Sequence, residues 1–295
     1  MATRRSSRRR GISWPASDPL SGGLKGKTTR WVCGLSYDGT AYCGWQVQPV
    51  AAARKPALQN VVEAALAKVA GHPIQTRCAG RTDAGVHALQ QVIQFDTAAI
   101  RPASAWIRGT NSGLPSSIAI RWAVTATPDF DARFGAKART YWYALLDAPV
   151  RPPLWRDRAG WSHRGLDGER MAQAAACLLG RHDFSAFRSS DCQAASPVRT
   201  IESIDIVRDG RFLLLAVTAN AFLHHMVRNL VGTLVYVGDG RRPIEWAAEV
   251  LASRNRALAA PTYAAAGLYL AAVRYDAIWQ LPITTAQSPS LCELV

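Results

Sequence analysis

The sequence predicts an α+β fold of two similar halves, each a mostly antiparallel sheet with flanking helices. Two observations support this prediction. In each half, short segments rich in β-branched and aromatic residues are mixed with one or two segments of helical periodicity. The chain also has 295 residues, 48% of them hydrophobic, which suits one large domain or two of ordinary size. The predicted parts are a tail (1–29), two halves (30–138 and 139–281) and a loose C-terminal tail (282–295).

The first half contains the clearest helix, over residues 57–70. Apolar residues repeat there at helical spacing, and Gly71 follows as a stop signal. Pro102 can open a second helix that reaches Arg108. The other apolar segments are predicted as strands, because they are rich in β-formers or alternate at period two: residues 31–37, 91–97 and 118–125.

The second half repeats this plan. Its helices are marked by a capping residue, a closing glycine, an apolar stripe or a first-turn proline: Asp167 to about Leu179 with Gly180 after it, residues 222–237, and one beginning near Pro243. Asp209-Gly210 predicts a hairpin turn between two β-prone segments. The predicted strands are residues 139–146, 198–207, 211–219 and 267–274.

The net charge indicates a polyanionic partner. It is +14 for the whole chain. Residues 1–30 hold eight Lys or Arg and one Asp, hence +7, so the remaining 265 residues carry the other +7. Because the body is basic in its own right, nucleic acid is favoured over a merely solvated basic surface.

Cysteine usage and hydropathy indicate an intracellular protein without membrane segments. None of the six cysteines forms a C-x-x-C pair, and most lie in apolar segments, as reduced, buried cysteines do. No apolar run approaches the length of a membrane span. We predict a cytoplasmic protein of bacterial type. The Arg- and Ser-rich N-terminus leaves an organellar transit peptide open, but its prolines and glycines favour a disordered basic tail that attracts phosphates.

The most informative stretch is the octet Gly80 to His87. It places one carboxylate, Asp83, between two glycines and two residues after Arg81. Glycine permits a sharp loop and close backbone approach, so Asp83 can be aimed at a substrate. Arg81 can stabilise its negative charge. The alternative is an aspartate that only caps a turn.

This octet resembles the catalytic signature of the TruA family of tRNA pseudouridine synthases. Further segments resemble the family in order, and the resemblance covers roughly residues 30–280: 36–46, 130–134, 139–143, 180–188, 219–232 and 267–270. It implies the pseudouridine synthase fold. It implies isomerisation of uridine to pseudouridine at positions 38, 39 and 40 of the tRNA anticodon stem-loop, without a cofactor. It also implies a homodimer whose basic cleft spans both subunits.

By this resemblance, Asp83 is the catalytic residue, acting either as a nucleophile or as a base on the ribose. Tyr141 falls on the family's motif tyrosine, where its ring can stack on the flipped uracil and its hydroxyl can assist proton transfer. Leu268 forms an apolar wall of the pocket, and Arg81 also contacts substrate. For Tyr141 and Leu268, plain core packing is the alternative.

Flipping a base costs a few kcal/mol, which basic and aromatic contacts to RNA must offset. The candidates are Arg133, Phe134, Arg139, Arg188 and Arg228. Some positions depart from the family pattern: Val47, Thr140, Trp142 and Asp191.

The pair His224-His225 raises the question of a metal site. The other four histidines have no partner at i,i+4 spacing, and adjacent residues on a helix point in different directions. We therefore predict no metal, and a phosphate-binding or packing role for the pair.

Two alternative functions stay open. A non-catalytic RNA-binding or RNA-folding protein could use the same scaffold, although the intact Asp83, Arg81 and Tyr141 argue against it. A hydrolytic glycosidase needs two carboxylates at a defined separation. Asp83 and Asp96 flank a predicted strand, so they would meet only if the chain folded back.

Overall fold

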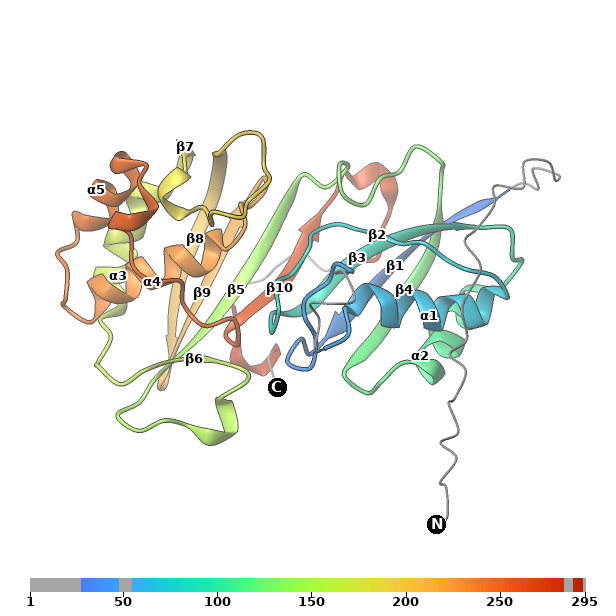
Figure 1. Cartoon of the computed structure of the whole chain (residues 1–295), viewed down its shortest axis with the longest axis horizontal. Coiled ribbons are helices and arrows are strands. Elements are labelled where there is room, and N and C mark those ends of the chain that lie inside the picture. The colour runs from blue at the N-terminus through green and yellow to red at the C-terminus, as the bar shows by residue number, and fades with distance from the viewer. Residues whose placement is uncertain (1–27, 48–54, 284–288, 294–295) are drawn as a thin grey trace, which may run out of the picture.

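The computed structural model describes residues 28–47, 55–283 and 289–293 (Figure 1). Most of the predicted N-terminal tail and the Pro- and Ala-rich stretch near residue 50 lie outside the described residues. Among the helices of the described chain, none combines the length and the apolar character needed to cross a bilayer.

One large sheet organises the molecule. Its strands follow the order β4-β1-β3-β10-β5-β9-β8-β7, with β2 paired to β3 and β6 paired to β5. Strand β10 (Leu268–Arg274) joins the two halves, since it runs parallel to β3 and antiparallel to β5. Figure 1 shows α1 and α2 with one half of this sheet, and α3, α4 and α5 with the other. The α+β prediction is confirmed.

The first half follows the predicted order closely. Helix α1 ends where expected, because Gly71 adopts a left-handed conformation and donates its N–H to the carbonyl of Ala67. The segment after Pro102 forms a π turn, Ala105–Gly109, and then the short helix α2. The elements are β1 (Thr29–Tyr37), α1 (Leu58–Ala70), β2 (Arg77–Cys78), β3 (His87–Thr97), α2 (Thr110–Gly113) and β4 (Ile118–Ala126).

The second half begins with β5, which starts at the predicted boundary between the halves. Asp167 caps α3 by accepting a hydrogen bond from the N–H of Arg170, and Gly210 turns the β8–β9 hairpin. Both features were predicted. The elements are β5 (Ala138–Asp147), β6 (Gly160–Ser162), α3 (Gly168–Ala175), β7 (Gly180–Asp183), β8 (Val198–Asp209), β9 (Phe212–Ala219), α4 (Met226–Gly238) and α5 (Trp246–Ser253).

Two predicted elements begin at other residues than expected. Strand β3 begins at His87 rather than at residue 91, and the second is α4. The apolar stripe predicts a helix from residue 222, but α4 begins only at Met226. His225, directly before it, has φ of 61° and so lies in the left-handed region, which interrupts a helix. Residues 222–225 therefore form a turn, and this turn carries both histidines of the His224-His225 pair.

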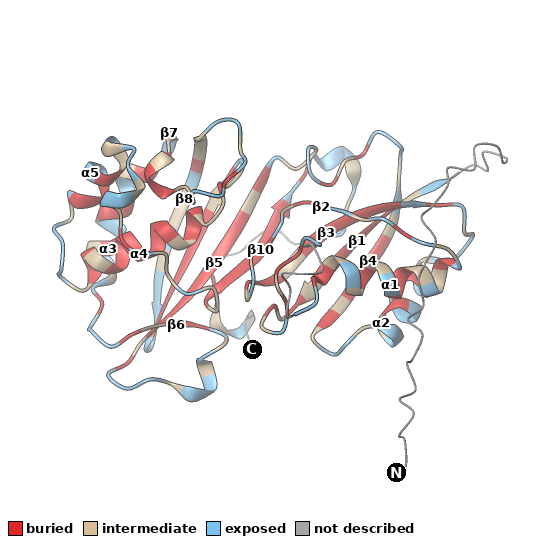
Figure 2. Ribbon diagram, in the orientation of Figure 1, coloured by how far each residue is buried: buried red, intermediate tan, exposed pale blue. Residues whose placement is uncertain are grey.

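Strand β5 lies at the centre of the core and is buried on both faces (Figure 2). Tyr141, Tyr143 and Leu145 pack in the larger cluster beneath the helices, whereas Trp142 and Leu146 pack in a smaller cluster on the opposite face. Because side chains alternate along a strand, a strand covered on both sides needs a nearly continuous apolar sequence. The fixed position of Tyr141 follows from this burial.

Candidate active site

The loop of residues 79–86 connects β2 to β3 and carries Asp83. Its ends are held by the sheet, since the N–H of Ala79 donates to the carbonyl of Val92 at 2.8 Å. Its tip is a tight turn, in which the N–H of Val86 donates to the carbonyl of Asp83 at 3.1 Å and Gly85 has φ of 76°. The prediction of a sharp glycine loop is confirmed.

Two glycines of the segment after β1 pack directly against the backbone of this loop. A Cβ on Gly44 would lie 2.7 Å from the carbonyl oxygen of Thr82, and a Cβ on Gly39 would lie 1.9 Å from that of Val86. The N–H of Trp45 donates to the same Thr82 carbonyl at 2.9 Å. Only glycine allows such close backbone approach. Gly39 and Gly44 therefore fix the position of the loop that carries Asp83.

Asp83 faces three cationic or ionisable side chains from the turn before α4 and from its first helical turn. Nε2 of His224 lies 3.3 Å from Oδ1, and Nε2 of His225 lies 3.4 Å from Oδ2. Nη1 of Arg228 lies 3.6 Å from Oδ2. The carboxylate is partly exposed, so a substrate can reach it. The positive charge of Arg228 and two imidazole rings therefore surround this carboxylate.

The two histidines reach the same carboxylate because of the left-handed backbone at His225. Their rings lie against each other at an interplanar angle of 35°, with centroids 3.9 Å apart. The reason given from sequence against a joint site is therefore wrong, since neither residue belongs to the regular helix. Burial lowers the pKa of His225 below its ordinary value of 6.5 and outweighs the opposite effect of Asp83.

These groups also determine what metal binding is possible. Ligand atoms of Asp83, His224 and His225 lie within 4.8 Å of one another, which a metal ion would need. The guanidinium of Arg228 beside the same carboxylate opposes a further positive charge there. The set is better suited to holding a carboxylate in its charged form than to holding a cation.

Arg228 is the partner of Asp83 that sequence reasoning missed, because it was assigned to RNA binding. Its Nε donates to the carbonyl of Tyr263 at 2.8 Å, and the N–H of Tyr263 donates back to the carbonyl of Arg228 at 3.2 Å. These bonds aim the guanidinium at the loop. The available signal was its spacing of one helical turn from the two histidines.

Arg81, which was expected to stabilise Asp83, lies elsewhere. Its side chain is exposed, and among the described residues it forms no ion pair with Asp83. Proximity in sequence therefore did not pair the two charges. Arg81 remains free to face a polyanion.

Tyr141 lies close to the catalytic loop. A Cβ on Gly80 would be 3.7 Å from its hydroxyl, and its ring meets Phe222 edge-on with centroids 5.0 Å apart. The hydroxyl makes no hydrogen bond to another described residue. Burial, followed by the nearby Asp83, raises the pKa of Tyr141, so the phenol keeps its proton at neutral pH. Leu268 is buried at the start of β10, beside Tyr269, which pairs with His87 at the end of the octet.

The remaining predicted residues divide into a structural and an exposed group. Arg139 donates its guanidinium hydrogens to backbone carbonyls, including that of Ala79 at 2.9 Å, and so clamps the base of the catalytic loop. Arg133 and Phe134 are exposed, with the guanidinium 5.3 Å from the ring centroid. Arg188 lies on the turn after a short 3-10 helix, Ser185–Phe187. An exposed aromatic beside an arginine suits stacking on a nucleobase.

Comparisons with known proteins agree with this geometry. The family model described as tRNA pseudouridine synthase matches residues 35–135 and 174–276. The chain is 53% identical over 254 residues to "tRNA pseudouridine synthase A" of Bordetella petrii, covering 85% of this chain and 93% of the relative. It is 53% identical to the protein of that name from Paraburkholderia phytofirmans, covering 86% of this chain and 92% of the relative.

A solved structure of an H/ACA RNP bound to a substrate RNA containing 2′-deoxyuridine also matches. It covers 70% of this chain and 44% of that chain at 11% identity, and its TM-score of 0.34 is too low to support an argument. The family assignment rests on the sequence matches, and the family model runs through the octet Gly80 to His87, α4 and β10. The resemblance noted from these segments is confirmed, and the chain belongs to the tRNA pseudouridine synthase family.

Proposed function

We propose that this protein isomerises uridine to pseudouridine at positions 38, 39 and 40 of the tRNA anticodon stem-loop, with Asp83 as its catalytic residue. The observation that carries the proposal is the position of Asp83. It stands on a loop fixed by close backbone contacts and faces Arg228, in a chain of this family.

The reaction is balanced without an external reagent. The N1–C1′ bond breaks, the uracil turns, and C5 joins C1′; the hydrogen leaves C5 for solvent and N1 gains one. Asp83 acts either as a nucleophile or as a base that abstracts a ribose proton. Both routes need an ionised carboxylate, which Arg228 stabilises at 3.6 Å.

Tyr141 and Leu268 shape the uracil site in this proposal. A raised pKa keeps the Tyr141 phenol protonated at neutral pH. The ring therefore stacks on the base, and the hydroxyl donates a hydrogen bond rather than serving as a ready-made phenolate base. Leu268 supplies an apolar wall. Exposed groups, among them Arg81, Arg133 and Phe134, hold the RNA outside the site.

We further propose that the protein acts as a cytoplasmic homodimer, with one tRNA lying across both subunits. The net charge of the whole chain is +14, which supports a large polyanionic substrate such as tRNA. Light scattering of the full chain at micromolar concentration tests the assembly. Twice the mass of one chain is expected, and the mass of a single chain would exclude the homodimer.

Tritium release tests the function. Unmodified tRNA labelled with tritium at C5 of uridine is incubated with the protein in the presence of EDTA, and tritium in water is counted. Substrates that keep a single uridine among positions 38, 39 and 40 then identify the target. Release from each is expected. Tight tRNA binding without release from any would favour the non-catalytic RNA-binding alternative.

A further inference from the structure

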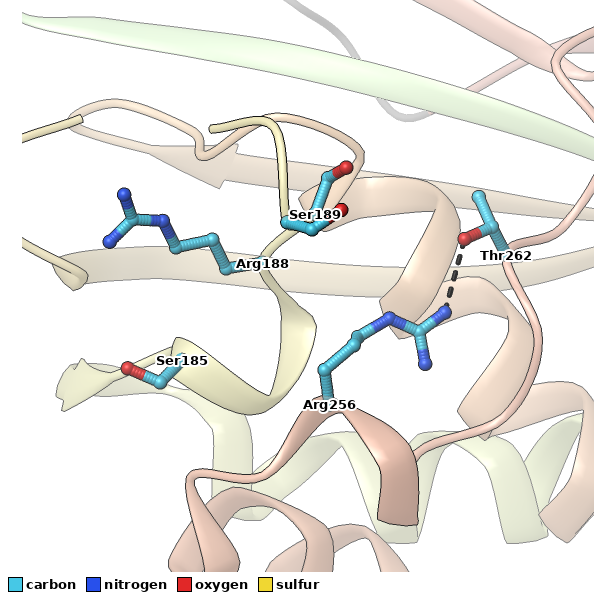
Figure 3. Close-up of a pocket in the computed structure, with 6 residues that line it drawn as sticks. Ser185, Arg188, Ser189, Arg256 and Thr262 are labelled. Atoms are coloured by element: carbon cyan, nitrogen blue, oxygen red, sulfur yellow. Dashed lines mark hydrogen bonds between the residues drawn. The ribbon is translucent and has the colours of Figure 1, made fainter. Parts of the chain in front are cut away.

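A polar pocket lies beside the active site and contains none of the catalytic groups. Its volume is about 480 Å³. Figure 3 shows Ser185, Arg188 and Ser189 on one side of it and Arg256 and Thr262 on the other. Ser190 completes the lining. We call this the Arg188–Arg256 pocket.

The two arginines of the pocket have no carboxylate partner among the described residues. Arg188 donates to the backbone carbonyls of Cys192 and Ala194. Arg256 donates to the carbonyl of Ala260 at 2.8 Å, and to neutral side-chain oxygens of the α4 and Thr262 segments at 3.0 and 3.1 Å. Both guanidinium charges are thus oriented by neutral oxygens and remain uncompensated.

Positive charges predominate around the pocket. A third arginine, Arg199, lies nearby. Burial lowers the pKa of Arg199, Cys192 opposes this effect, and the charge of Arg188 adds to it. Its Nε is buried and has no hydrogen-bond partner in the described chain. Two carboxylates contact lining hydroxyls: Asp183 accepts from Ser185, and Asp191 from Ser190. Asp183 is itself paired with Arg254 at 3.5 Å. The balance favours an anion.

Both sides of the pocket are bonded to the groups around Asp83. On one side, the N–H of Ser189 donates to the carbonyl of His224 at 3.0 Å, and the ring of His224 contacts Asp83. On the other, Thr262 directly precedes Tyr263, whose carbonyl holds Arg228. A group bound in the pocket is therefore held in a fixed relation to the catalytic carboxylate.

We propose that the Arg188–Arg256 pocket binds one phosphodiester group of the RNA strand that carries the target uridine. Arginines and hydroxyls are the side chains that contact RNA phosphates, and such contacts set register without reading sequence. The pocket would place the strand so that the flipped base reaches Asp83. This inference rests on the proposed function, since it assumes that the ligand is the substrate RNA.

The first test changes the charge of the pocket. Ser190 is exposed, so Ser190→Glu adds a negative charge without disturbing the core, and Ser190→Gln is the matched neutral control. Arg188→Gln removes a positive charge. The affinity of the full chain for an anticodon stem-loop RNA is measured by fluorescence anisotropy across salt concentrations.

Ser190→Glu and Arg188→Gln are expected to weaken binding about tenfold at low salt, and Ser190→Gln, which alters the same position without adding a charge, should weaken it less than Ser190→Glu does. One lost phosphate contact should reduce the slope of log affinity against log salt by about 0.7 to 0.9. Unchanged affinity and slope in both charge variants would overturn the proposal. If Arg188→Gln fails to fold, Ser190→Glu still decides.

The second test locates the phosphate. RNAs in which one phosphodiester is replaced by a neutral methylphosphonate are bound to wild type and to Ser190→Glu. At one position close to the target uridine, a methylphosphonate should lower the RNA affinity of wild type. The same replacement should not lower the affinity of Ser190→Glu further, because groups in contact have coupled, non-additive effects. Equal losses in both proteins at every position would overturn a specific site. These are binding measurements, so absent tritium release in wild type would sink the proposed function separately.

Discussion

Nη1 of Arg228 lies 3.6 Å from Oδ2 of Asp83, although the two residues belong to different halves of the chain. The guanidinium is aimed by its bond to the carbonyl of Tyr263, and the carboxylate is fixed by its glycine-supported loop. The carboxylate and the positive charge beside it therefore come from different halves of the chain and meet only through its tertiary fold.

Replacing Arg228 should reduce the rate of isomerisation more than it reduces tRNA binding. An opposite charge within about 4–6 Å favours the ionised form of a carboxylate, so we expect a loss of roughly 10-fold or more in kcat for Arg228→Gln. Tritium release under saturating tRNA measures kcat. Arg274→Gln is the matched control, because Arg274 pairs with Glu202 at the surface. If only KM rose in Arg228→Gln, Arg228 would be an RNA contact alone.

Substitution can separate the role of the Tyr141 ring from that of its hydroxyl. Tyr141→Phe keeps the buried ring and its edge contact with Phe222, so the fold should persist, and loss of a hydrogen-bond donor should slow turnover about tenfold. Tyr141→Ala removes a core aromatic and should destabilise the protein by about 3–5 kcal/mol. Thermal unfolding and tritium release on the same samples distinguish the effects. Equal turnover in Tyr141→Phe and wild type would leave the hydroxyl without a role.

Gly44 should be needed for the position of Asp83 rather than for folding. A methyl group there would meet the carbonyl of Thr82 at 2.7 Å, so Gly44→Ala must displace the catalytic loop. We expect at least about a tenfold loss of kcat, since small displacements of reacting groups are costly.

Gly71→Ala is the control for Gly44→Ala. Gly71 also has a positive φ, 79°, but nothing lies within 4 Å of the added methyl group. It should lose about 1–2 kcal/mol of stability from backbone strain and keep its activity per folded molecule. A fully active Gly44→Ala would contradict the supporting role of Gly44.

His87 should make the fold less stable at acidic pH. Burial lowers the pKa of His87 below 6.5, despite the opposing effect of Asp38. The unfolded chain therefore binds this proton more readily than the folded one. The contribution of His87 to the free energy of unfolding is complete above about pH 6.5. It falls as the pH decreases towards and through the pKa of the folded state, by up to about 1.4 kcal/mol per pH unit.

Denaturant unfolding at several pH values measures this effect. His87→Gln should flatten the decline of the free energy of unfolding between about pH 7 and 5. The exposed His163 supplies the control, and His163→Gln should follow the wild-type curve. A decline as steep in His87→Gln as in wild type would assign the acid sensitivity to other groups.

Local signals predicted most of the fold. The helix that ends at Gly71 and the turn at Gly210 each depend on residues adjacent in the chain, and the structure has both. The short strands β2, β6 and β7 were missed. In β7 the sequence Gly-Arg-His-Asp has few β-formers. The start of α4 was misplaced because the apolar stripe continues through Phe222, whereas the left-handed backbone of His225 has no local signature.

The site was predictable only in part. Asp83 and its glycines are neighbours in sequence, so the loop could be identified from the octet. Its partners come from a turn and a helix in the other half. Their approach depends on how β10 joins the two halves, and periodicity carries no information on such long-range contacts. Arg81 was predicted as the partner of Asp83 because it is close in sequence, but in the described residues Asp83 pairs with His224, His225 and Arg228 instead.

The most direct measurement compares wild type with Asp83→Asn in single-turnover tritium release from C5-labelled tRNA. Asparagine keeps the shape of the side chain but removes its charge, so the loop and RNA binding should persist. We expect tritium release to fall by at least about 10³-fold, as for the loss of an essential catalytic group, with tRNA affinity near that of wild type. Release by Asp83→Asn at the wild-type rate would contradict the central role of Asp83.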